Sequence, residues 1–198
     1  NESYSIIRKL IEFMNKDTIH KISESKLDKS TDYIKHNFKF ITNEKLYTYK
    51  DILKVANKVK SSFKYNGIFI DPYNSLIKDG EIMRELGGHE YDYQACTELR
   101  MFCKKQQVTI WVSTHANTGA LRIRHAIGHE YQGYPIPPLA SDVEGGGKFV
   151  NRADDFMVVH RYTQHPTEWV YNHLHIRKVK EIETRGKPTV IDQPIRLK

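Results

Sequence analysis

The 198-residue sequence predicts an α/β fold: a mostly parallel sheet flanked by helices, with antiparallel strands added at the C-terminal end. Two apolar strands, at residues 67–71 and 108–113, are separated by a long helical segment. A strand–helix–strand order of this kind produces parallel pairing with a right-handed crossover. Farther along, residues 155–162 and 167–179 have the pattern of two strands joined by a turn, which predicts antiparallel pairing.

The spacing of apolar residues predicts three flanking helices, at residues 3–15, from Thr48 to about Phe63, and at residues 91–107. Thr48 precedes Asp51 by three residues, which is the spacing of a capping box. In that motif each side chain bonds the backbone of the other residue, so we expect a well-defined start for the second helix.

The segments between these elements have weaker signatures. Residues 16–37 are too polar for a core and are expected to be partly helical, whereas residues 38–42 alternate like a short strand. Residues 78–90 carry three glycines and mixed charge, which predicts a loop. Residues 119–140 are rich in Arg, His and Pro and have the composition of an insertion.

The composition limits the class of protein. The chain has 31 basic and 24 acidic residues, a net charge of +7, which suits a polyanionic partner but also serves solubility alone. Cys96 and Cys103 lie seven residues apart on one predicted helix, so we expect reduced thiols and a cytoplasmic chain. No apolar run reaches the length of a membrane span. Because the sequence begins at Asn1 and not at Met, we expect a fragment or a processed chain.

Polar side chains follow both strands of the predicted parallel unit. Asp71 ends the first strand, and His115 follows the second. Ligands bind at the carboxyl edge of parallel sheets, and a strand ending in Asp has the form of a Walker B element, whose acid holds a Mg²⁺-bound water. An imidazole beside it could donate to a phosphate oxygen. The alternative, that each residue only begins a turn, stays open for either one alone.

Two basic segments complete the candidate features. Residues 142–154 contain three glycines with Lys148 and Arg152, which suits close approach to an anion and equally suits a flexible surface loop. The P-loop pattern G-x-x-x-x-G-K-[ST] is absent from the sequence. Lys178 and Lys180 would share one face of a strand and point at one anion, although edge strands also carry lysines against aggregation.

The ten histidines raise the question of a metal site. None has the H-E-x-x-H spacing, and the pair His173 and His175 has no obvious third ligand in the sequence. We therefore do not expect a catalytic zinc site.

The order of these parts is more specific than any one of them. The segments GIFIDPYNSL, VTIWVSTHANTG, EGGGKFVNRADD and IRKVKE, in this order, resemble the RecA-like core of hexameric replicative DNA helicases. The similarity is to DnaB-like, phage primase-helicase and mitochondrial Twinkle types, from about Ser3 to the C-terminus. It implies that residues 1–198 are the C-terminal part of one ATPase domain, whose first strand and P-loop lie upstream.

The resemblance implies roles for the catalytic candidates. Asp71 matches the Walker B acid, which binds Mg²⁺ and ATP, and His115 matches the residue that senses the γ-phosphate. Lys178 and Lys180 match a Lys-x-Arg pair that reaches the neighbouring subunit's ATP. Here the second residue is Lys, a point charge in place of a bidentate fork. Glu2 lies close to the position of the family's catalytic glutamate.

The resemblance also implies a DNA-binding segment. Residues 142–154 match a central-channel segment that contacts single-stranded DNA, with Lys148 and Asn151 as the preferred contacts. Arg152 in the same segment is a further candidate, as are Arg122 and Arg124 in the predicted insertion.

The implied function is an ATP-driven ring helicase that translocates on single-stranded DNA during replication. ATP and Mg²⁺ are the implied cofactors, a homo-oligomeric ring, expected to be a hexamer, is the implied assembly, and a primase is a candidate partner. The chain alone is expected to be inactive in ATP hydrolysis. Three alternatives stay open: a RecA-like ATPase that is not a helicase, a non-catalytic nucleic-acid-binding or assembly module, and a metal-dependent hydrolase that uses the histidine-rich insertion.

Overall fold

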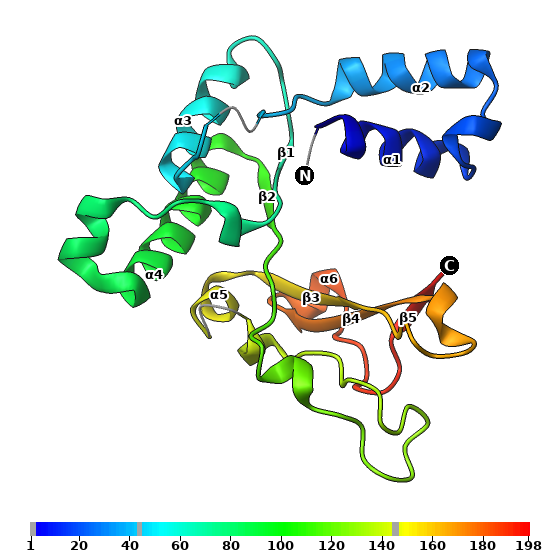
Figure 1. Cartoon of the computed structure of the whole chain (residues 1–198). Coiled ribbons are helices and arrows are strands. Elements are labelled where there is room, and N and C mark those ends of the chain that lie inside the picture. Colours follow the sequence, from blue (N-terminus) through cyan, green and yellow to red (C-terminus); the bar gives the residue numbers. More distant parts are fainter. Residues whose placement is uncertain (1–2, 43–44, 144–146) are drawn as a thin grey trace.

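The computed structural model describes residues 3–42, 45–143 and 147–198. Within these residues the strands form two sheets (Figure 1). The parallel sheet contains β1 (Gly67–Ile70) and β2 (Thr109–Val112). The second sheet is antiparallel, in the order β3 (Asp155–His160), β4 (Asn172–Val179) and β5 (Ile195–Leu197). Both predicted kinds of pairing are therefore confirmed.

The parallel unit is built as the sequence predicts. The crossover helix α4 (Gly80–Gln106) connects β1 to β2, and α3 (Tyr49–Lys60) lies beside α4 (Figure 1). The register pairs Ile70 with Val112, so the residues that follow the two strands also lie next to each other. The helices bury one face of the sheet, because Ile52 from α3 and Leu99 from α4 pack with Ile70. The helices thereby hold the carboxyl ends of the two strands in place.

The prediction of a loop at residues 78–90 is wrong, because α4 already begins at Gly80. The Asp79 carboxylate caps this helix by accepting hydrogen bonds from the backbone nitrogens of Glu81 and Ile82, at 3.0 and 3.3 Å. The glycines do not exclude a helix here. Gly87 alone has non-helical angles, with φ +74°, and marks a kink in the long helix.

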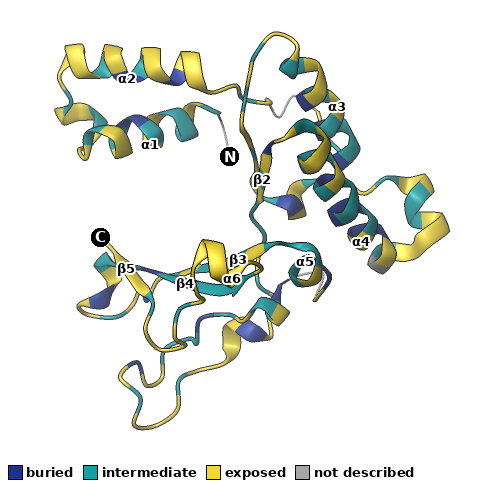
Figure 2. Cartoon of the chain, turned by 180° about the vertical axis from the view of Figure 1, so that it is seen from behind, coloured by how far each residue is buried: buried dark blue, intermediate teal, exposed yellow. Residues whose placement is uncertain are grey.

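The N-terminal part is a helical hairpin that projects away from the parallel sheet (Figure 1). Its helices are α1 (Ser3–Asn15) and α2 (Glu24–Asn37), joined through the short 3₁₀ turn η1 (Ile19–Lys21). Figure 2 shows that most of its surface is exposed, with few buried positions. The predicted helix at residues 3–15 is confirmed.

The prediction of a strand at residues 38–42 is wrong, because this segment is extended but forms no ladder within the described residues. The Phe38 backbone nitrogen instead donates to the Ile34 carbonyl and closes α2. The ring of Phe38 stacks on Phe40, with centroids 6.4 Å apart. Alternation of apolar residues therefore reflects local aromatic packing here. Across the described part of the chain, no helix is long and apolar enough to cross a membrane.

The C-terminal part places residues 119–140 against the antiparallel sheet. Apart from the short 3₁₀ turns η3 (Ala120–Arg122) and η4 (Ala140–Asp142), this segment is irregular, with isolated bridges. The ring of Tyr131 stacks on Tyr162, just beyond β3, with centroids 4.3 Å apart. Two further short helices, α5 (Gly147–Arg152) and α6 (Ile182–Arg185), precede β3 and follow β4. The first residues of the predicted strand 167–179 form the 3₁₀ turn η5 (Glu168–Val170), so the strand itself is shorter than predicted.

The capping box of α3 generates a first prediction. Both reciprocal bonds are present: the Thr48 hydroxyl accepts from the Asp51 backbone nitrogen at 3.1 Å, and the Asp51 carboxylate accepts from the Thr48 nitrogen at 3.0 Å. We expect Thr48→Ala to lower the free energy of unfolding by about 1 kcal/mol, because a helix donor loses its partner. Urea unfolding measures the change.

The matched control is Ser23→Ala at the start of α2. In the described structure the Ser23 side chain makes no capping bond. Its substitution is therefore expected to change the free energy of unfolding by less than about 0.5 kcal/mol. Equal losses in the two variants would contradict the assigned role of the capping box.

Candidate functional site

The carboxyl ends of β1 and β2 are joined by hydrogen bonds. The Ser113 backbone nitrogen donates to the Ile70 carbonyl, and the Tyr73 nitrogen donates to the Ser113 carbonyl, both at 2.9 Å. The Ser113 hydroxyl also donates to the Asp71 carboxylate at 2.5 Å. The peptide bond between Asp71 and Pro72 is cis. The Asp71 side chain is thus exposed at the edge of the sheet and oriented by a hydroxyl from the neighbouring strand tip.

A second link holds the residues that follow β2. Asn74 lies in the 3₁₀ turn η2 (Tyr73–Ser75), directly after β1. Its side-chain oxygen accepts from the Thr114 hydroxyl at 2.8 Å and from the His115 backbone nitrogen at 3.3 Å. The structure therefore brings Asp71 and the exposed His115 to the same sheet edge, as the strand order predicts. Their roles with a nucleotide stay predictions.

Sequence reasoning missed Ser113 and Asn74 as members of this edge. Both belong to the short polar segments that follow the two strands, so their positions carried a usable signal. The signal was incomplete because the partner of each side chain depends on the pairing register of the strands, which residue types alone do not specify.

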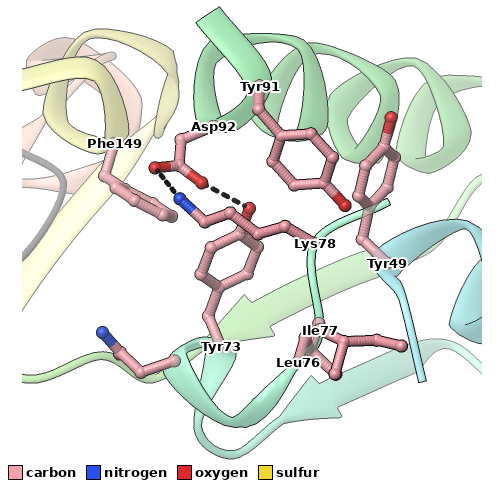
Figure 3. Close-up of a pocket in the computed structure, with 9 residues that line it drawn as sticks. Tyr49, Tyr73, Leu76, Ile77, Lys78, Tyr91, Asp92 and Phe149 are labelled. Carbon is pink, nitrogen blue, oxygen red and sulfur yellow. Dashed lines mark hydrogen bonds and ion pairs between the residues drawn. The ribbon is translucent and has the colours of Figure 1, made fainter. Parts of the chain in front are cut away.

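Beside this edge lies a cavity of about 310 Å³ with aromatic walls (Figure 3). The buried Asp92 carboxylate, only 6% exposed, accepts from the Tyr73 hydroxyl at 3.0 Å and from the Lys78 ammonium at 2.9 Å. Burial, and then the neighbouring Asp92 charge, raise the pKa of Tyr73 far above its usual value. The Tyr73 phenol therefore stays protonated and acts as a donor. The cavity is lined by Tyr49, Tyr73, Asn74, Leu76, Ile77, Lys78, Tyr91, Asp92 and Phe149.

Residues 142–154 contain a helix, so the prediction of a loop throughout is wrong. At the start of this segment the Asn117 backbone nitrogen donates to the Asp142 carbonyl at 2.7 Å, and Val143 forms an antiparallel bridge with Ala116. Helix α5 follows and packs against α4 through buried residues, among them Phe149. Three further sites of the sequence prediction, Glu2, Gly145 and Gly146, lie outside the described residues.

The predicted DNA-contacting residues differ in exposure. Lys148 is only 7% exposed and lies near the thiol of Cys96, so its burial argues against a direct contact with DNA in this conformation. Burial is the main reason why the pKa of Cys96 rises to about 12, although the Lys148 charge opposes the shift. Asn151 is exposed, whereas the Arg152 guanidinium lies over the Tyr93 ring, 4.0 Å from its centroid. Exposed arginines of the separate segment 119–140 are Arg122 and Arg124.

Lys178 and Lys180 point toward the junction of α5 and β3, within the same chain. The Lys178 ammonium donates to the carbonyls of Val150 and Ala153 at 2.5 and 2.8 Å, which satisfies acceptors at the end of α5. The Lys180 ammonium contacts the Asp154 carboxylate at 2.9 Å. Burial acts in the opposite direction, but the hydrogen bond from Lys180 and the nearby cations lower the pKa of Asp154. The two lysines converge as predicted, yet on groups of their own chain.

The histidines gather between the insertion and the antiparallel sheet. His125 stacks on His129 with centroids 4.0 Å apart, and the buried His173 hydrogen-bonds the Glu168 carboxylate at 3.1 Å. Burial is the main cause that lowers the pKa of His175 to about 4, and the charge of Arg177 adds to it. Among the residues that the structure describes, no three His, Cys, Asp or Glu side chains are grouped so as to hold a metal ion.

Comparison with known proteins supports the fold. No family model matches the sequence, and no curated protein matches it. Among solved structures, the ATPase domain of one helicase superposes with a TM-score of 0.68 at 14% identity, covering 99% of this chain and 67% of that one. A DnaB-like replicative helicase, described with its interactions with primase, gives a TM-score of 0.69 at 14% identity, covering 99% of this chain and 45% of that one.

The chain thus spans about two thirds of the first relative and under half of the second. At this identity the likeness establishes the fold alone. The predicted fold is confirmed: the chain has the mixed parallel and antiparallel architecture of RecA-like helicase ATPase domains.

The two lysines generate a prediction that separates their roles in stability. Lys178→Met keeps the apolar part of the side chain but leaves helix carbonyls without their donor, so we expect a loss of about 1–2 kcal/mol in the free energy of unfolding. The matched variant Lys180→Met breaks only an exposed ion pair and should cost less than about 1 kcal/mol. Urea unfolding of both variants tests this, and equal losses would contradict it.

The histidine cluster generates a prediction about pH. His175, 2% exposed, is neutral in the folded chain down to about pH 4, whereas the unfolded chain binds a proton near pH 6.5. The unfolded state thus binds more protons between these values, and stability falls as the pH is lowered from 6.5 to 4. His175→Gln should remove about 2 kcal/mol of this decrease in unfolding experiments at stepped pH.

The control for this measurement is His20→Gln, in the turn η1 of the helical hairpin. We expect this variant to retain the pH dependence of the unchanged chain. A profile that is unaltered in His175→Gln would contradict the prediction, as would an equal flattening of the profile in the control.

Proposed function

We propose that this chain works within an ATP-driven helicase of the replicative type, as the C-terminal part of its ATPase domain. The observation that carries the proposal is the meeting of Asp71, Ser113 and His115 at the carboxyl edge of a parallel strand–helix–strand unit. Parallel sheets bind their ligands at such edges. The match of nearly the whole chain to helicase ATPase domains supports the same assignment.

The donor set of this edge fits Mg²⁺ and ATP. Asp71 provides an exposed carboxylate and Ser113 a hydroxyl, and hard oxygen ligands of this kind are those that Mg²⁺ prefers. When bound, Mg²⁺–ATP would supply the phosphoryl group and neutralise much of its charge. Asp71 would hold the metal's water shell, and Ser113 would keep the carboxylate in one orientation. The exposed His115 imidazole would donate a hydrogen bond to a γ-phosphate oxygen.

We further propose that single-stranded DNA binds along exposed polar groups of residues 142–154 and 119–140. Asn151, Arg122 and Arg124 are the contacts that their exposure favours. The net charge of +7 supports a contact made chiefly to phosphates, which would be tolerant of sequence and weakened by salt.

The assembly is part of the same proposal. A homo-oligomeric ring, expected to be a hexamer, would place each ATP between two subunits, with Lys180 as the more exposed of the two candidate lysines at the neighbour's site. Primase stays a candidate partner, the cytoplasm the proposed location, and Glu2 a candidate base.

A second candidate function is a non-catalytic nucleic-acid-binding or assembly module of the same fold. It is favoured by one observation: Lys178 serves α5 of its own chain, where a finger acting on another subunit would need its ammonium free to reach out. A RecA-like ATPase without strand separation is the third possibility, because the fold alone does not distinguish it.

The test measures ATP hydrolysis by the full-length protein with and without single-stranded DNA. We expect turnover that DNA stimulates, a loss of turnover in Asp71→Asn, and a fall of about 10²-fold in His115→Ala. His20→Ala, in the helical hairpin, is the control and should match the unchanged protein.

Two results would point elsewhere. Absence of turnover under ring-forming conditions would leave the binding module as the better assignment. Turnover with DNA stimulation but without strand separation would favour the ATPase that is not a helicase.

A further inference from the structure

We propose that the contact between Tyr73 and Phe149 couples the acidic tip of β1 to the segment 142–154, with both rings as positioning residues. This role in turnover rests on the proposed function. The physical coupling itself does not, because it concerns the packing of two parts of this chain.

The Tyr73 ring is held at both of its ends. Its backbone nitrogen donates to the Ser113 carbonyl at 2.9 Å, two residues after Asp71. Its hydroxyl donates to the Asp92 carboxylate, which Lys78 also contacts (Figure 3). A side chain held in this way transmits a displacement of the strand tip, because it has little rotamer freedom with which to absorb it.

The Phe149 ring meets Tyr73 from the other side. Their centroids lie 5.0 Å apart with an interplanar angle of 78°, the edge-to-face arrangement that aromatic pairs favour. Phe149 is 8% exposed and belongs to the same apolar cluster as Tyr73, together with Ala95 and Val143. A movement of α5 against the sheet edge must therefore repack this contact.

A second contact reaches the same segment from the other strand tip. Ala116 and Asn117, directly after His115, pair with Val143 and Asp142. Residues 142–154 are thus attached to the tip of β1 through Phe149 and to the region beyond β2 through their first residues. Attachment to both tips is what a segment needs in order to respond to the relative position of Asp71 and His115.

The alternative is that Tyr73 and Phe149 only fill the core. The two cases differ in one consequence: coupling is reciprocal, so a change at α5 must alter the strand tips, and a change at the tips must alter α5. Loss of core packing elsewhere would lower stability without this selective exchange of effects.

The first experiment is hydrogen exchange on the full chain, which needs no nucleotide. In Phe149→Leu we expect at least 10-fold faster exchange of the hydrogen-bonded amides of Tyr73, Ser113 and Asn117. Tyr73→Leu should accelerate exchange in α5 in the same way. The control Ile34→Ala removes a residue that is 3% exposed, in the separate helical hairpin, and should leave these amides unchanged.

The second experiment measures ATP hydrolysis by the full-length protein. In Phe149→Leu, the stimulation of kcat by single-stranded DNA should fall about 10-fold, while the rate without DNA and the KM for ATP stay within twofold. Tyr73→Phe, which keeps the ring contact and loses only the hydroxyl bond to Asp92, should retain most of the stimulation.

The two experiments separate the failures. If the unchanged protein does not hydrolyse ATP, the proposed function is wrong, and the exchange data alone decide whether the coupling exists. Unaltered exchange at the strand tips in Phe149→Leu would overturn the coupling, as would equal acceleration in Ile34→Ala. Unchanged DNA stimulation in Phe149→Leu would overturn its role in turnover.

Discussion

The parallel pairing of β1 with β2 is the constraint on which the rest of the structure depends. Because Ile70 pairs with Val112, Asp71 and Ser113 emerge side by side and form a hydrogen bond. A shift of one residue would turn the apolar side chains of a strand to the opposite face of the sheet. The burial of Ile70 against α3 and α4 therefore selects the register, and the register selects the partners at the sheet edge.

Around this edge the chain uses buried polar groups to hold aromatic side chains in place. The pair of Lys78 and Asp92 is costly to bury and stabilises little by itself. Its value is geometric, because the Asp92 carboxylate also receives the Tyr73 hydroxyl and so orients the ring that meets Phe149. The same principle applies to Lys178, whose ammonium secures the end of α5. The candidate nucleotide edge and the candidate DNA-binding segment thereby share one packed core.

Most elements could be predicted from local pattern. The helix at residues 3–15, the capping box of Thr48 and the strand–helix–strand unit follow from periodicity and capping chemistry, which act within a few residues. The segments 38–42 and 78–90 were predicted wrongly. The first lacked a strand partner in the described structure, and the second was stabilised as helix by the Asp79 cap despite its glycines. In both, contacts outside the local pattern outweighed residue propensity.

The sequence by itself determined the α/β class and the acid and histidine that follow successive strands, because these depend on residue type and spacing. Only the tertiary structure decided which groups those residues meet. Lys148 lies buried although its charge suggested a surface contact, and Lys178 bonds carbonyls of its own chain. The physical reason is that a side chain's partners are set by the packing of elements distant in sequence, and local pattern contains no record of that packing.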